Sequence, residues 1–513
     1  MILRRVLSLT TAALLGGALA AGPLTTPATA RTTTSCPAPA TANRQLRGVW
    51  IASVTNIDWP SAPGLSVARQ QAEYVRLLDN AVARHLNAVF VQIRPTADAF
   101  WPSPYEPWSQ YLTGTQGKNP GYDPLAFLVR EAHARGLEFH AWMNPYRVLM
   151  KADPSLLSPD HPARRHPDWT HPYAGKLYYD PGIPDVRHFV ERAMLDAVRR
   201  YDIDGVHFDD YFYPYPSGTA DFPDDATFAK YGSGFTDKAA WRRHNIDLLI
   251  QEMDRRIHAL KPWVKFGVSP FGIWRNKSSD PDGSDTNGLE SYTAISADTR
   301  GWVKKQWIDY LAPQIYWYIG FAVADYAKLV PWWARQVDGT GVQLYIGQAD
   351  YREGAAGQAA PWQDPAELSR HLTFDQGYPQ VAGDIHFSAK DMDADRLGAV
   401  SRMVADHYAR PALVPLMPRL GGRAPQRPHP AVAGSAVTWR PVTSAARYAV
   451  YRFDGPAAAR CGVGATSRIA VTGGTSFTDP TAEPGKNYVY VVTALDRLWH
   501  ESPAARARPA HLS

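Results

Sequence analysis

Between residue 46 and about residue 410, short apolar runs alternate with longer amphipathic stretches. Gly136 and Asp237 suit a helix C-terminal cap and an N-cap within this pattern. Helical periodicity is clear over 67–85, 123–136 and 237–260. Eight apolar runs have the length and composition of buried strands: 46–53, 86–95, 137–145, 203–210, 264–272, 308–317, 342–350 and 381–391. Eight successive strand–helix units predict a (β/α)8 TIM barrel over residues 44–410.

An open doubly wound sheet is the alternative architecture. It would usually carry a Gly-rich phosphate-binding turn after its first strand. The segment "ASVTNIDWP" (52–60) follows the first predicted strand and contains no such turn. The count of eight strands also favours closure into a barrel.

The C-terminal part has a different pattern. Residues 411–428 are rich in Pro and Arg and predict a linker, and residues 429–513 alternate apolar and polar positions between turn signals. This predicts a small all-β sandwich. Trp439 together with "YAVYR" (448–452), "TSFTDP" (475–480) and "GKNYVYVVTALD" (485–496) resembles a fibronectin type III module.

The first 30 residues predict a signal peptide. They combine Arg4 and Arg5 with an apolar run and small residues at Ala28–Ala30. A membrane anchor is less favoured, because the run is short and rich in Ala, Gly and Thr. We therefore expect a secreted or cell-envelope protein with a flexible mature N-terminus over 31–43 and no integral membrane segment after signal removal.

Charge and cysteine content narrow the function classes. The formal charge is +5, or +3 without Arg4 and Arg5, and no Lys/Arg run indicates nucleic acid. Cys36 and Cys461 show no metal-ligand spacing, and whether they pair stays open. No GxSxG motif is present. The sequence predicts no cofactor and no metal.

Aromatic residues point to a glycan partner. The chain holds 17 Trp and 26 Tyr, many of them in Pro- and Gly-rich loops such as "AFWPSPYEPWSQY" (99–111). A protein core needs few Trp, because this side chain is rarely fully buried. Aromatic rings in loops suit the flat apolar faces of sugars.

Strand register places one acid at the expected catalytic end. In the strand 203–210, Val206 and Phe208 share a face that should pack on helices, while His207 and Asp209 point into the barrel. Active sites of such barrels lie at the C-terminal ends of the strands. Asp209 is thus placed to meet a substrate, and Asp210 would brace the site or bind a sugar hydroxyl.

Polar and aromatic groups near other strand ends complete the predicted site. The predicted substrate contacts are Arg94, Asp98, Trp142, Asn144, Arg147, His207, Tyr211, Gln314, Tyr316, Trp317, Asp350 and Lys390. Structural alternatives stay open for several of them. Asp209 could be a structural acid paired with an arginine, His207 an ordinary interior histidine, and Lys390 a cap of the last strand. Trp142 and Trp317 could serve packing.

Many blocks of the chain, in order, resemble the bacterial glycosyl-hydrolase-like family ten. They are "LRGVWIASVTNIDWPS" (46–61), "QIRPTADAFWPS" (92–103), "PWSQYLTG" (107–114), "AWMNPYR" (141–147), "DGVHFDDYFYP" (204–214), "GVSPFGIWRN" (267–276), "ADTRGWVKKQWIDYLAPQIYW" (297–317) and "YIGQADYR" (345–352). The resemblance covers about residues 44–400 and implies a (β/α)8 barrel, export and action on glycans. Some members are thought to cut peptidoglycan strands stripped of stem peptides, and a trailing fibronectin type III module fits the family.

A more distant similarity concerns the fourth strand. "DGVHFD" (204–209) is similar to the D-G-F-R-x-D motif of the α-amylase clan, which implies that Asp209 is the nucleophile. His207 replaces the clan's Arg, and the clan's fifth-strand Glu is missing from "GVSPFG" (267–272).

A glycosidase normally needs an ionised and a protonated carboxyl group. The sequence leaves the acid open among Asp98, Glu106, Glu290, Asp298 and Asp350. Glu106 is favoured because its aromatic loop should raise its pKa by burial, and Asp350 comes next. The predicted catalytic residues are Asp209, Glu106 and Asp210.

These observations predict an exported glycoside hydrolase that acts on polysaccharide, and the expected substrate is peptidoglycan glycan strands that lack stem peptides. The alternative is a non-catalytic glycan-binding barrel at the cell surface.

Overall fold

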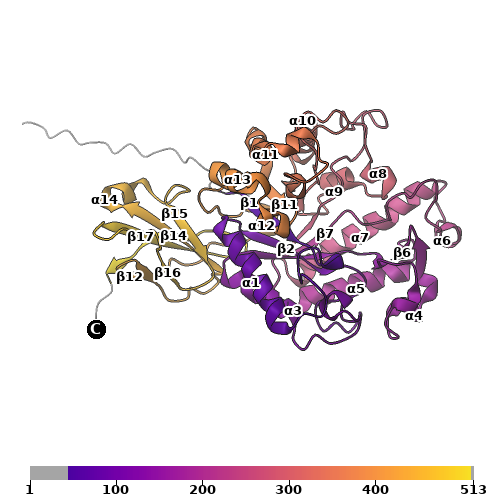
Figure 1. Cartoon of the computed structure of the whole chain (residues 1–513), viewed down its shortest axis with the longest axis horizontal. Coiled ribbons are helices and arrows are strands. Elements are labelled where there is room, and N and C mark those ends of the chain that lie inside the picture. The colour runs from indigo at the N-terminus through magenta and orange to yellow at the C-terminus, as the bar shows by residue number, and fades with distance from the viewer. Residues whose placement is uncertain (1–43, 510–513) are drawn as a thin grey trace, which may run out of the picture. The chain divides into compact units, whose positions relative to one another are not determined.

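The computed structural model describes residues 44–509. Its central element is a closed barrel of eight parallel strands, in the order β1-β2-β3-β7-β8-β9-β10-β11 (Figure 1). The strands are β1 (Leu46–Ile51), β2 (Ala88–Arg94), β3 (Glu138–Met143), β7 (Gly205–Phe208), β8 (Lys265–Val268), β9 (Tyr310–Leu311), β10 (Gln343–Gln348) and β11 (Val381–His386). Every predicted strand is present and the barrel is confirmed, so the open sheet is excluded.

Helices lie around the outside of these strands (Figure 1). The longer ones are α1 (Val67–Ala83), α3 (Pro124–Ala134), α5 (Pro184–Arg200), α7 (Lys238–Leu260), α10 (Tyr326–Val337), α11 (Glu367–Asp375) and α13 (Ala399–His407). The shorter ones are α2 (Gln110–Thr113), α4 (Pro162–Arg165), α6 (Asp225–Tyr231), α8 (Ser291–Ala294), α9 (Thr299–Lys305) and α12 (Ala389–Ala394). The short helix α14 (Gly455–Ala458) belongs to the C-terminal segment and follows β14 (Arg447–Asp454) directly.

Two predicted helix ends are confirmed. The Asp237 carboxylate accepts hydrogen bonds from the backbone N–H groups of Ala239 and Ala240, as an N-cap does. Gly136 follows α3 with φ +76°, a left-handed conformation that glycine adopts without strain.

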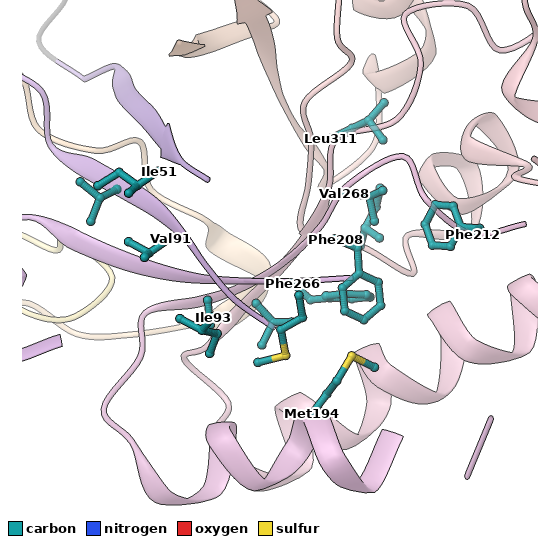
Figure 2. Packing of buried hydrophobic residues seen from close by; sticks show 14 of the residues in the cluster. Ile51, Val91, Ile93, Met194, Phe208, Phe212, Phe266, Val268 and Leu311 are labelled. Carbon is teal, nitrogen blue, oxygen red and sulfur yellow. The ribbon is translucent and has the colours of Figure 1, made fainter. Parts of the chain in front are cut away.

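The main core fills the layer between barrel and helices. Val206 and Phe208 are fully buried there, as their register predicts. The Phe208 ring meets the Phe266 ring edge to face at 5.2 Å. Figure 2 shows both rings close to Met194, which belongs to α5. Burial of one such side chain stabilises the fold by about 1.5–3 kcal/mol.

A small antiparallel sheet of β4 (Arg147–Leu149), β5 (Thr170–Tyr173) and β6 (Lys176–Tyr179), in the order β4-β6-β5, follows β3 and was not predicted. A two-residue turn joins β5 to β6, with φ +48° at Ala174 and +75° at Gly175. Positive φ at both positions fits the twist of a hairpin. Alanine rarely adopts this conformation, so the sequence carried a weak turn signal.

The C-terminal segment is all-β, as predicted. One sheet contains β12 (Ala431–Ala433), β13 (Ala436–Thr438), β16 (Ser476–Thr478) and β19 (Arg508–Pro509). The other contains β14 (Arg447–Asp454), β15 (Arg468–Thr472), β17 (Tyr488–Leu495) and β18 (Ala505–Arg506). Trp439 and Tyr448 lie in their own small core. Assignment to the fibronectin type III class stays a prediction.

Several predictions fall outside the described residues. These are the signal peptide (1–30), the flexible mature N-terminus (31–43) and the question of Cys36. Over residues 44–509, no helix combines the length and apolar character needed to cross a membrane.

Candidate active site

A cavity of about 310 Å³ lies at the C-terminal ends of the barrel strands. Its lining combines aromatic rings with a few polar groups, the composition typical of a ligand site. Predicted site residues that line it are Trp142, Arg147, Asp209, Asp210, Tyr211, Gln314 and Tyr316. These predicted residues therefore lie together around one cavity.

Asp209 follows directly after β7 and is almost completely buried. Its carboxylate accepts hydrogen bonds from the Trp142 indole, the Asn144 amide and the backbone N–H of Tyr211, each at 3.1 Å. Burial raises the pKa of Asp209, while the Arg147 charge and these hydrogen bonds oppose the rise. Asn144 does not line the cavity but holds the carboxylate that does.

Asp210 lies beside Asp209 and also lines the cavity. The Tyr215 hydroxyl donates a hydrogen bond to its Oδ2. Burial and the negative charge of Asp209 raise the pKa of Asp210 to about 8. Two neighbouring buried acids titrate as a pair, and the first proton resides mainly on Asp210. Two adjacent acids that share one proton have the charge state that glycoside hydrolysis needs.

Arg147 supplies the positive charge of the site. Its Nε and Nη2 donate to the Pro95 carbonyl oxygen at 3.1 and 2.9 Å. Its guanidinium lies 4.6 Å from the centroid of the Tyr211 ring. The Tyr211 ring stacks in turn on Tyr215, with centroids 4.9 Å apart. Arg147, Tyr211 and Tyr215 thus form one wall of the cavity.

Glu106, the favoured acid, lies elsewhere. Its two oxygens accept from Arg94 Nε at 2.7 Å and Nη2 at 2.5 Å, and both side chains are fully buried. This is the bidentate geometry that the guanidinium fork prefers. Neither residue lines the cavity. The structure therefore separates Glu106 and Arg94 from the acids at Asp209 and Asp210.

His207 is placed below the cavity, within the barrel interior. It is fully buried, its Nδ1 lies 3.1 Å from the Tyr310 hydroxyl, and its Nε2 accepts from the Trp50 indole at 3.0 Å. Burial and the charge of His140 hold the pKa of His207 well below its usual range. It therefore supports the site as a neutral interior histidine.

The other predicted contacts do not line the cavity. Asp350 pairs with His386 at 3.0 Å, and His386 Nε2 lies 3.3 Å from the hydroxyl of Tyr408, the residue that follows α13. Asp98 is fully buried, which raises its pKa to about 6. Trp317 packs against the main core, and Lys390 is exposed. The backbone N–H of Lys390 donates to Asp58, which lies in the loop that follows β1.

One cluster within residues 44–509 has the spacing of a metal site, formed by Asp254, His258 and Asp309. It lies at the other end of the barrel, since Asp309 directly precedes β9. Arg419 approaches Asp309 to 3.2 Å and Asp254 to 3.6 Å. Because an arginine and a histidine already balance the two acids, this cluster is an ion-pair network.

The predicted site did not include several residues that line the cavity, among them Gln92, Tyr215 and Ser269. Gln92 and Ser269 lie near the ends of predicted strands, so register and polarity carried a signal for both. Tyr215 lies in a loop, where no register applies.

Comparisons with known proteins identify the family of the chain. The chain matches the glycosyl hydrolase-like 10 family over residues 45–364. Glycosyl hydrolase YngK of Bacillus subtilis (strain 168) is 48% identical over 488 residues, covering 91% of this chain and 94% of that protein. Glycosyl hydrolase DigH of Escherichia coli (strain K12) is 41% identical over 366 residues, covering 67% of this chain and 83% of that protein.

Solved structures are more distant. The glycoside hydrolase domain of PgaB (BpsB) from Bordetella bronchiseptica is 14% identical and covers 71% of this chain and 98% of that one, with a TM-score of 0.45. The family match and the two curated relatives are sufficient for assignment. The chain belongs to the glycosyl hydrolase-like 10 family and is a glycoside hydrolase.

Proposed function

We propose that the protein is an exported hydrolase that cuts peptidoglycan glycan strands lacking stem peptides. The signal-peptide pattern of residues 1–30 supports export. The family resemblance supports this glycan class. The cavity is bordered by Trp142, Tyr211 and Tyr316, rings that suit sugar faces.

One observation carries the catalytic part of the proposal. Among residues 44–509, the acidic side chains lining the cavity are Asp209 and Asp210. Asp209 acts as the ionised nucleophile or base, supported by three hydrogen bonds and Arg147. Asp210 holds the proton and gives it to the leaving glycosidic oxygen. This assigns the acid role to Asp210 in place of Glu106.

The test compares two substrates. Purified mature protein is incubated with peptide-free strands and, separately, with intact peptidoglycan, and the products are analysed by mass spectrometry. We expect short glycans from the peptide-free strands alone, each carrying the mass of one added water per bond cut.

Two outcomes would contradict the proposal. Equal release from intact peptidoglycan would remove the restriction to stripped strands. Retention of the protein on the glycan without any products would favour the alternative, a glycan-binding barrel. Export is checked separately by sequencing the N-terminus of the protein recovered from the cell envelope or medium, which should begin near residue 31.

A further inference from the structure

Gln92 on β2 has an amide whose orientation is fixed. Its Oε1 accepts from the backbone N–H of Ser53 at 3.1 Å and of Val54 at 2.9 Å. Both partners are donors, so the oxygen of the amide must face them. The Nε2 end is therefore the end that remains for other contacts.

That end has no acceptor in the protein. Gln92 is fully buried, and no group within residues 44–509 accepts a hydrogen bond from its Nε2. Gln92 also lines the cavity that holds Asp209 and Asp210. Buried donors in native structures are almost always satisfied, because an unpaired one is costly. An acceptor on a bound substrate would satisfy this one.

The surroundings of Gln92 indicate which acceptor fits. Trp142 on β3 is its register partner, and Ala52 and Ile57 line the same cavity. A donor-only amide beside apolar surface suits an acetamido group, whose carbonyl accepts while its methyl packs. A hydroxyl offers no methyl group, and an ammonium offers no acceptor.

Gln92 is also close enough to Asp209 for one bound glycan to contact both residues. Trp142 lies between them, since it pairs with Gln92 in register and donates to Asp209 at 3.1 Å. Neighbouring strands lie about 4.8 Å apart, so two steps span about 10 Å. A sugar bound beside Asp209, or the next one along, can therefore present its substituent to Gln92.

We propose that Gln92 determines specificity by donating a hydrogen bond to the N-acetyl carbonyl of a substrate sugar. The site would then select 2-acetamido sugars over sugars with a free amine at that position. This inference deepens the proposed function and rests on it for the identity of the polymer that is cut. Gln92 binds substrate and takes no part in proton transfer.

The test measures binding by the full mature chain carrying Asp209→Asn, which prevents turnover. Calorimetry compares N-acetylglucosamine oligosaccharides with glucosamine oligosaccharides of equal length. We expect a preference for the N-acetylated ligand. Adding Gln92→Met should weaken binding of that ligand about tenfold and leave the free-amine ligand nearly unchanged.

A second variant keeps the hydrogen bonds between residue 92 and the loop that holds Ser53 and Val54. Gln92→Glu retains an oxygen for the Ser53 and Val54 amides but replaces the donor with a carboxylate. We expect it to lose the N-acetyl preference and to bind the free-amine ligand more tightly than before. Gln343→Glu is the matched control at the start of β10, where Gln343 contacts Leu416 and does not line the cavity. This control variant should leave the ratio of the affinities for the N-acetylated and free-amine ligands unchanged.

Three results would overturn the inference. They are equal weakening for both ligands, unchanged binding in both Gln92 variants, and no binding of either ligand before Gln92 is changed. Cleavage by the unaltered protein separates this inference from the proposed function. Equal cleavage of N-acetylated and de-N-acetylated strands overturns the role of Gln92 alone. Absent cleavage with a persisting N-acetyl preference overturns the proposed cleavage of peptidoglycan strands alone.

Discussion

Two buried acids at opposite ends of the barrel strands, Glu138 and Asp210, differ in their nearest charged neighbours. At the amino-terminal end, Glu138 lies 2.5 Å from Lys265 Nζ and 3.0 Å from His140 Nε2. Burial alone would raise its pKa, but the Lys265 charge and the His140 hydrogen bond lower the pKa of Glu138 to about 2. At the carboxyl-terminal end, Asp210 has another acid as its neighbour, and its pKa rises to about 8.

Asp204 repeats the first arrangement. It lies 3.0 Å from Arg447 and 2.7 Å from His133, and these partners hold its pKa well below the usual range despite burial. A buried acid with a cationic partner keeps a fixed charge and supports the fold. Two buried acids side by side share a proton, and this allows acid–base chemistry. The partner of each acid, more than its depth, separates the two roles.

The largest expected effect concerns Asp209. Asp209→Asn should lower kcat by about 10²–10⁴-fold, because the ionised partner of the acid pair is lost. The melting temperature should stay close to that of the unaltered protein. The rate of product release from peptide-free strands measures kcat, and thermal unfolding measures the melting temperature. Asp237→Asn is the control, since Asn caps a helix as well as Asp. Full activity of Asp209→Asn would show that this end of the barrel performs no acid–base chemistry.

A substitution at the amino-terminal end of the barrel strands should lower the stability of the fold. Lys265→Met leaves Glu138 buried without its ammonium partner and should lower the free energy of unfolding by about 3–5 kcal/mol. Urea denaturation measures this. The double variant with Glu138→Gln should recover part of the loss, because the unpaired charge is gone. A single variant as stable as the unaltered protein would contradict the view that paired acids support the fold.

Asp210 should make stability depend on pH. Between about pH 4 and pH 8 the folded protein keeps a proton on Asp210 that the unfolded chain releases. Its contribution is therefore fully present below pH 4 and is lost as the pH rises through 8. Asp210→Asn should flatten the fall in the free energy of unfolding across this range. Denaturation at several pH values tests this, and an identical slope in both proteins would contradict the raised pKa.

The smallest effect is a shift of the pH profile. A hydrogen bond from Gln314 favours the ionised form of Asp210. Gln314→Leu should therefore move the alkaline limb of kcat/KM, expected near pH 8, upward by about 0.4–1 pH unit. A downward shift, or no limb near pH 8 in the unaltered enzyme, would exclude Asp210 as the proton donor.

Local patterns in the sequence were enough to predict the barrel and the position of Asp209 at the end of β7. Apolar runs and the two-residue period are properties of neighbouring residues, so they identified all eight strands and the inward face of β7. The prediction of Glu106 as the acid did not take into account its ion pair with Arg94. Burial and aromatic neighbours were visible in its loop, but the position of Arg94 across that loop was not.

Other features depend on contacts between distant segments. The orientation of Gln92 is set by Ser53 and Val54, which precede it by almost 40 residues in the chain. The pairing of Asp204 with Arg447 joins residues that lie 243 positions apart. No periodicity encodes such contacts, and only the closed barrel and the following sheets bring them together.

The setting of Arg147 has a consequence for the conditions in which the enzyme works. Its guanidinium is held by a backbone carbonyl and a tyrosine ring, neither of which carries a full negative charge. It is buried, as are Asp209 and Asp210. Dissolved ions screen exposed charges strongly and buried ones much less. The charge state of the acid pair should therefore change little between solutions of low and high ionic strength.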